Sequence, residues 1–141
     1  MVRLNMSIFS RLFGKKTKKV EEKSTVESSL DDFEDAFKNK PELADALKNT
    51  MFLDPRKIDI TLKDAVSKAR EMERKGDKLR AAIWYRIAGG LAIYKGDISK
   101  VKEYFGKYSK LTGKSLKILE IPEECVKGAQ KYYAKYLEKS D

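Results

Sequence analysis

The chain contains no histidine, a single cysteine (Cys125), one tryptophan and three prolines among its 141 residues. Without histidine, the commonest general base and metal ligand is missing, and a serine or cysteine nucleophile lacks its usual partner. One cysteine cannot form an internal disulfide, and it cannot by itself supply the ligand set of a structural zinc site. We therefore expect a protein that is not an enzyme and that holds no metal and no cofactor.

Long apolar runs are also missing. No stretch of 18 consecutive apolar residues occurs, so the sequence predicts no membrane-spanning helix. A lysine cluster after residue 14 interrupts the only apolar stretch near the N-terminus, which argues against a secretory signal. We expect a cytoplasmic protein, either free or held peripherally at the inner face of the membrane.

Charge is abundant and unbalanced. Lys and Arg number 31 against 22 Asp and Glu, which gives a net charge of +9, and charged residues make up 38% of the chain. The usual charged fraction is about 25%, and a composition rich in Lys and Glu is typical of hot-growing organisms. The positive excess favours an anionic partner, either nucleic acid or a lipid surface. Solvated lysines on helix faces are the alternative explanation.

Residues 1–13 form an amphipathic segment. Its apolar side chains share one face of a helix: Met6, Ile8, Phe9, Leu12 and Phe13. Four cations follow directly: Lys15, Lys16, Lys18 and Lys19. An apolar helical face flanked by cations is typical of a segment that lies in the interface of an anionic membrane. The alternative is that this face docks on the protein's own core or on a partner helix.

Two further segments precede the main domain. Residues 14–28 are polar and predict a flexible linker that tethers the N-terminal segment. Residues 29–53 predict an acidic arm of two short helices, in which Phe33 and Phe37 share a face and Pro41 opens the second helix. Residues 31–60 contain eight acidic and five basic side chains, so this part of the chain has a net negative charge.

Residues 61–139 predict the main domain, a bundle of antiparallel helical hairpins. Apolar spacing indicates helices over 62–75, 78–95, 98–111 and 122–138, and a short extended piece over 116–121. The helix over 78–95 is apolar around most of its circumference, so we expect it at the centre. Lys-Gly-Asp occurs at 75–77 and again at 95–97, where Gly suits the end of one helix and Asp the cap of the next.

Residues 65–88 resemble a tetratricopeptide repeat (TPR), with Ala69 in the first helix, Gly76 in the turn, and Ala81, Tyr85 and Ala88 in the second helix. Because the match covers one repeat, residues 62–111 also resemble the microtubule-interacting-and-trafficking (MIT) domain, a three-helix bundle. That resemblance implies a groove beside the third helix that receives peptides of partner proteins. The residues it assigns to this groove are Tyr85, Val101, Phe105 and Tyr108. A generic helical bundle shows the same spacing of small and aromatic residues.

The sequence therefore predicts an all-α adaptor that binds partner peptides or helices and attaches peripherally to an anionic membrane. The alternative is a basic RNA- or ribosome-associated protein, since tyrosines and lysines interleave near the C-terminus and aromatic rings beside cations bind single strands. Tyrosines at helical spacing more often belong to a core. A small enzyme that uses carboxylates, Lys or Tyr ranks last. Neither the partner nor the oligomeric state is readable from these patterns.

Deleting residues 1–19 is expected to weaken binding to anionic vesicles by about tenfold or more, because each basic residue contributes about 1 kcal/mol near such a surface. Flotation with vesicles of phosphatidylglycerol and phosphatidylcholine measures the effect, and pure phosphatidylcholine vesicles are the control. Unchanged binding of the deletion variant would rule out the membrane role of this segment.

Overall fold

A computed structural model describes residues 29–137. All regular secondary structure in this range is helical, and no strand occurs within it. The chain divides after Ala36 into two units, which are treated separately. Of the first unit, the structure describes residues 29–36, which are helical and contain the buried Phe33. The predicted segments 1–13 and 14–28 lie outside the described residues.

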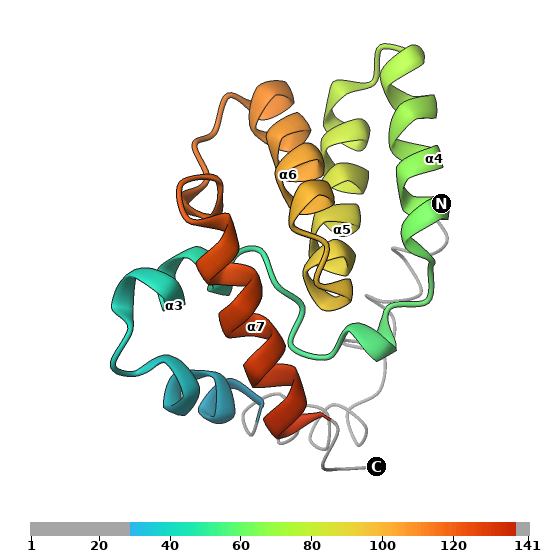
Figure 1. Cartoon of the computed structure of the whole chain (residues 1–141). Helices are drawn as coiled ribbons and strands as arrows, with labels where there is room; N and C mark the ends of the chain where they lie inside the picture. The colour runs from blue at the N-terminus through green and yellow to red at the C-terminus, as the bar shows by residue number, and fades with distance from the viewer. Residues whose placement is uncertain (1–28, 138–141) are drawn as a thin grey trace, which may run out of the picture. The chain divides into compact units, whose positions relative to one another are not determined.

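The second unit, described over residues 37–137, contains five α-helices (Figure 1). Their bounds are α3 Pro41–Lys48, α4 Leu62–Arg74, α5 Lys78–Lys95, α6 Ile98–Thr112 and α7 Pro122–Tyr136. Short 3-10 turns lie at Pro55–Lys57 and Lys117–Leu119. The predicted antiparallel hairpin architecture is confirmed, since α4, α5 and α6 lie side by side and are joined by tight turns (Figure 1).

The turns between these helices have the predicted chemistry. Gly76 and Gly96 adopt left-handed backbone angles, with φ of 79° and 74°, at the ends of α4 and α5. The Asp77 carboxylate accepts a hydrogen bond from the Arg80 amide at 3.1 Å, and Asp97 accepts one from the Lys100 amide at 3.0 Å. Such caps satisfy amides that the first helical turn leaves without partners. Two short turns, residues 75–77 and 96–97, therefore fix both hairpins.

Helix α5 is the central buried helix, as predicted. It packs against α4 on one side and α6 on the other, and also contacts α7, whereas α4 and α6 do not pack against each other. Tyr85 is only 2% exposed, and Ala81 and Ala88 are fully buried. The same helix carries Gly89 and Gly90, where a Cβ atom would come within 2.6 Å of the Phe105 ring and 2.5 Å of the Phe52 ring, respectively. The two glycines therefore create the space that both rings occupy.

The segment before α4 is held by long-range polar contacts. The Tyr133 hydroxyl of α7 donates to the Phe52 carbonyl at 2.6 Å, and Arg86 of α5 donates to the Asn49 carbonyl at 2.7 Å. Helix α3 packs against α7 and the turn Lys117–Leu119. Residues 37–53 belong to the same compact unit as the helices that follow.

One predicted element is wrong. The extended piece expected over residues 116–121 is a 3-10 turn at Lys117–Leu119, with Ile118 fully buried. Its alternating apolar residues do resemble a strand. No neighbouring strand exists among the described residues, however, and burial of Ile118 is achieved by a turn.

Gly89→Ala is expected to destabilise the protein by about 1–2 kcal/mol, because overpacking against the buried Phe105 ring outweighs the gain in helix propensity. Gly106→Ala in α6 is the matched control, since nothing lies within 4 Å of its Cβ position. It should stabilise the protein by about 0.5–1 kcal/mol. Urea unfolding of both variants measures the difference. A free energy of unfolding that is unchanged in Gly89→Ala would contradict the packing described.

Candidate functional site

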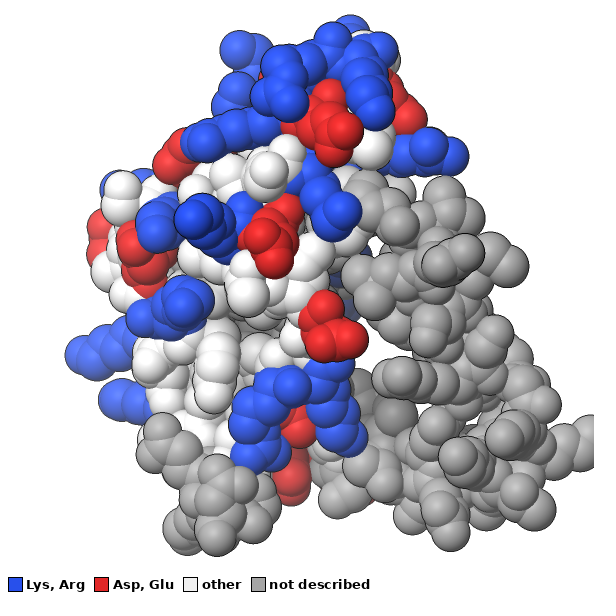
Figure 2. Space-filling model, turned by 90° about the vertical axis from the view of Figure 1, so that its right-hand side faces the viewer, with Lys and Arg blue, Asp and Glu red and all other residues white. Residues whose placement is uncertain are grey.

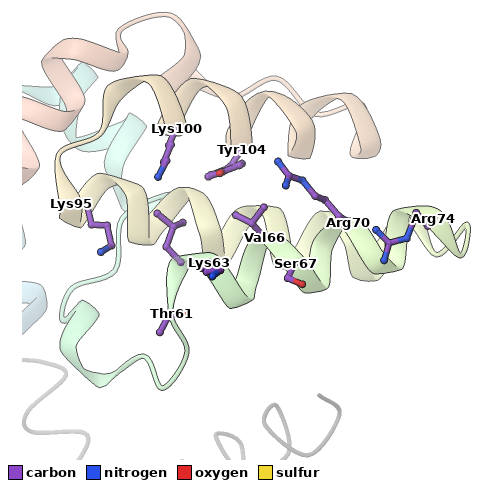
Figure 3. Close-up of a pocket in the computed structure, with 10 residues that line it drawn as sticks. Thr61, Lys63, Val66, Ser67, Arg70, Arg74, Lys95, Lys100 and Tyr104 are labelled. Atoms are coloured by element: carbon purple, nitrogen blue, oxygen red, sulfur yellow. The ribbon is translucent and has the colours of Figure 1, made fainter.

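An open groove with a volume of about 730 Å³ runs between α4 and α6 (Figure 3). It exists because both helices pack on α5 and not on each other. Its floor is apolar and barely accessible: Leu62 and Val66 from α4 and Tyr104 from α6 are between 6% and 7% exposed. The complete lining is Thr61, Leu62, Lys63, Val66, Ser67, Arg70, Arg74, Lys95, Lys100 and Tyr104.

The rim of the groove is strongly basic. Five of the lining residues are cations and none is acidic: Lys63, Arg70, Arg74, Lys95 and Lys100. Figure 3 shows Arg70 and Lys100 extending from α4 and α6 toward the space between the helices. Within residues 29–137, no ion pair involves Lys63, Arg74 or Lys95. The groove therefore presents uncompensated positive charge above a narrow apolar strip.

Two of the rim cations are only loosely paired. Arg70 lies 3.8 Å from a Glu103 oxygen across the groove, and Lys100 lies 3.9 Å from the Asp97 carboxylate in its own helical turn. All four side chains are substantially exposed. Exposed ion pairs of this length contribute little to stability, about 1 kcal/mol at most. An incoming anion can therefore replace these partners at small cost.

A polar network fixes the geometry at one end of the groove. The Tyr85 hydroxyl of α5 donates to the Glu73 carboxylate of α4 at 2.7 Å, and Lys107 of α6 lies 3.6 Å from the same carboxylate. Tyr85 also stacks on Tyr104, with ring centroids 6.3 Å apart. This network joins all three helices and holds the Tyr104 ring in the groove floor.

The network shifts the ionisation of its members. The hydrogen bond from Tyr85 lowers the pKa of Glu73 below its ordinary value of 4.5, and the nearby Lys107 charge adds to the effect. Burial raises the pKa of Tyr85 to about 12, with a further contribution from the Glu73 carboxylate. The pair is therefore held as an ionised carboxylate and a protonated phenol across the neutral range.

The groove residues assigned through the MIT resemblance lie elsewhere. Tyr85, Val101 and Phe105 are at most 2% exposed and fill the contacts of α5 with its neighbours, so they are not available to a partner. Phe105 and the half-buried Tyr108 border a smaller pocket of about 330 Å³ on the other side of α6. Tyr85, Val101 and Phe105 thus belong to the protein's own core.

The basic rim was not recognised in the sequence, although part of its signal was present. Lys63, Ser67, Arg70 and Arg74 are spaced by four, three and four residues, which places them along one face of α4. Lys95 is the last residue of α5 and Lys100 lies in the first turn of α6, and no local pattern connects them to α4. Only the shared packing on α5 brings the two sets together.

The groove lining contains neither Cys125 nor an acidic side chain. No cluster of three or more His, Cys, Asp or Glu side chains that could hold a metal occurs in residues 29–137. Cys125 is fully buried, and burial raises the pKa of its thiol to about 12. Among the helices in this range, none is long and apolar enough to cross a membrane. The predicted membrane residues, Met6 to Lys19, lie outside the described part of the chain.

Comparison with protein-family models, with curated proteins and with solved structures finds no match to this chain. The candidate site is therefore interpreted from its own geometry.

Tyr85→Phe is expected to lower the free energy of unfolding by about 1 kcal/mol at neutral pH, because Glu73 loses a hydrogen-bond donor. The raised pKa of Tyr85 stabilises the fold below pH 10 and loses that effect as the pH rises toward about 12. The lowered pKa of Glu73 stabilises the fold above pH 4.5, and this is lost on acidification.

Thermal unfolding across the alkaline range measures this effect. The wild type should lose more stability than Tyr85→Phe between pH 10 and 12, where the phenol of the unfolded chain ionises first. Tyr94→Phe, which removes a partly exposed hydroxyl, is the control and should follow the wild-type curve. Parallel curves for all three proteins would contradict a role for the Tyr85–Glu73 bond.

Proposed function

We propose that this protein is a non-enzymatic adaptor that binds an acidic segment of a partner protein in the groove between α4 and α6. One observation carries the proposal: five cations and no carboxylate line the groove, and an apolar floor lies beneath them. Complementary charge accelerates encounter and selects the partner, while burial of apolar side chains on the floor supplies affinity.

The groove is suited to an extended or helical peptide. Its length follows α4 from Thr61 at the start of the helix to Arg74 at its end. Side chains of a bound segment that point inward meet Val66 and Tyr104, and carboxylates on either side meet the cations. The rigid network of Glu73, Tyr85 and Lys107 holds these surfaces in place before binding, which lowers the entropic cost of association.

The resemblance to a TPR or to an MIT domain supports the same proposal. The small residues on which it rests, Ala69, Ala81 and Ala88, are fully buried where α4 and α5 meet. Under the MIT resemblance, peptides bind beside the third helix of the bundle. The third helix is α6. The basic groove lies along one side of it, whereas Phe105 and Tyr108, which the resemblance assigns to the peptide site, border the pocket on its other side.

A binding role is preferred over catalysis because of the groove's chemistry. Its polar groups are cations and the hydroxyls of Thr61, Ser67 and Tyr104. No carboxylate or imidazole lines it that could activate one of these hydroxyls as a nucleophile. The proposal places the protein in the cytoplasm, with the amphipathic segment over residues 1–13 attaching it to the inner face of the membrane.

The double substitution Lys63→Glu with Lys95→Glu is expected to weaken partner binding by at least about tenfold, which corresponds to about 1.4 kcal/mol. Neither lysine takes part in an ion pair within residues 29–137, so the fold should be retained. A photoreactive cross-linker at position 67, inside the groove, captures the partner in cells of the source organism. Mass spectrometry then identifies the cross-linked segment.

The matched control is Lys127→Glu with Lys131→Glu, which changes the net charge equally at exposed positions of α7. An acidic protein segment that cross-links from position 67, is retained in the control and is lost in the groove variant supports the proposal. Nucleic acid cross-linked from position 67 would instead favour the RNA-associated alternative. Equal capture of the partner by both variants would refute the proposal that it binds in the groove.

A further inference from the structure

The end of the hairpin array where α4 and α6 finish and α5 begins has a surface of its own. Figure 1 shows the α4–α5 turn and the C-terminus of α6 at the same end of these three helices. Gly76 and Gly113 end α4 and α6 in left-handed conformations. The chain after α6 is held by the Ser109 hydroxyl, which donates to the Lys114 carbonyl at 2.6 Å. Both turns are thus fixed by hydrogen bonds and glycine geometry.

This surface, which we call the basic end, is dense in cations. Its exposed basic residues are Arg74, Lys75, Lys78, Arg80, Lys110 and Lys114. In the same turns the only acidic residue is Asp77, whose carboxylate caps α5 and lies 3.6 Å from Arg80. Glu71 and Glu73 lie in the last turn of α4, where they pair with Lys75 and Lys107. Figure 2 shows Lys and Arg gathered at the upper end of the view, with few acidic side chains among them.

Four of these cations are not engaged in ion pairs with described residues. Within residues 29–137, Arg74, Lys78, Lys110 and Lys114 form no ion pair. Two chain segments that are distant in sequence, residues 74–80 and 110–114, therefore bring positive charge to the same end of the helices. Such an arrangement suits a broad anionic surface, because one small anion would not reach all of them.

An aliphatic side chain stands among these cations. Leu79 is 71% exposed, the highest exposure of any large hydrophobic residue in the described chain, and lies between Lys78 and Arg80 in the first turn of α5. Ile83, one turn further along the same face, is 40% exposed. A leucine gains nothing from a phosphate backbone, but it gains free energy on entering the acyl boundary of a bilayer. An exposed leucine among cations therefore favours a lipid surface over nucleic acid as the partner of this end.

We propose that the basic end is a membrane-contact site of the folded domain. Leu79 enters the interface of an anionic bilayer, and the cations around it meet the lipid phosphates. This site shares Arg74 with the rim of the peptide groove, whereas its other cations and Leu79 lie outside the groove lining, and it is separate in sequence from the N-terminal segment. It supplies the second signal that stable peripheral attachment generally requires, and it sets which end of α4, α5 and α6 faces the lipid.

A fluorescent probe on the full-length chain tests contact directly. In the variant Leu79→Cys, the environment-sensitive dye NBD is attached to the exposed thiol, while the buried Cys125, with its raised pKa, stays unlabelled. Adding vesicles of equal parts phosphatidylglycerol and phosphatidylcholine should shift the emission to the blue. The same dye at position 127 on α7 should not respond, and pure phosphatidylcholine should shift neither.

Charge reversal provides the second measurement. Lys78→Glu with Lys114→Glu should weaken vesicle binding on the order of 25-fold, since each basic residue contributes about fivefold near an anionic surface. Lys127→Glu with Lys131→Glu should leave binding near the wild-type value. Cross-linking from position 67 should be unaffected by the first pair, so the groove and the basic end are tested separately.

Either of two results would contradict the proposal that the basic end contacts the membrane. In the first, the protein binds anionic vesicles while the dye at position 79 stays in water, so that the N-terminal segment alone makes contact. In the second, a single-stranded oligonucleotide and not the vesicles changes the dye's emission, which makes the basic end a nucleic-acid surface.

Discussion

The close approach of α6 to α5 at Gly89 supports most of what is described above. The Phe105 ring lies where a side chain at position 89 would begin, and on the neighbouring Gly90 the Phe52 ring does the same. Two adjacent glycines in the middle of a helix cost helix propensity, about 1 kcal/mol each relative to alanine. Burial of two aromatic rings offsets that cost. The glycines also let α5 be covered by two elements, the following helix α6 through Phe105 and the segment before α4 through Phe52.

The position of α5 explains why a groove exists at all. A central helix that is apolar around most of its circumference receives both α4 and α6, so the backbones of these two helices stay apart and only side-chain pairs such as Arg70–Glu103 bridge them. Val66 and Tyr104 expose only their edges in the strip between the two helices. This apolar strip is too narrow to require burial by a further helix. Charged residues occupy both margins because those positions face solvent. The basic groove and the buried core are therefore two results of one packing arrangement.

Much of the second unit could be predicted from sequence because its signals are local. The repeated Lys-Gly-Asp turns, the caps at Asp77 and Asp97, and the apolar circumference of α5 each lie within one short window, and the structure confirms them. Contacts between distant segments had no such signal. Spacing showed that Tyr85 and Phe105 face something apolar, but it did not distinguish the protein's own helices from a partner. The cations of the groove come from three elements, and only the fold unites them.

The bond from Tyr133 to the Phe52 carbonyl spans 81 residues of chain, and the contact of Arg56 with the Leu137 carbonyl spans the same separation. Loop-closure entropy grows with the logarithm of the enclosed length, by about 0.6 kcal/mol for each doubling. The α4–α5 and α5–α6 hairpins enclose only a few residues and form at much lower entropic cost. Contacts of the last helix thus close a long loop of chain that contains both hairpins, whose turns do not depend on that helix. Chain synthesis presents the elements in that order too, because α7 is the final helix of the described chain to emerge.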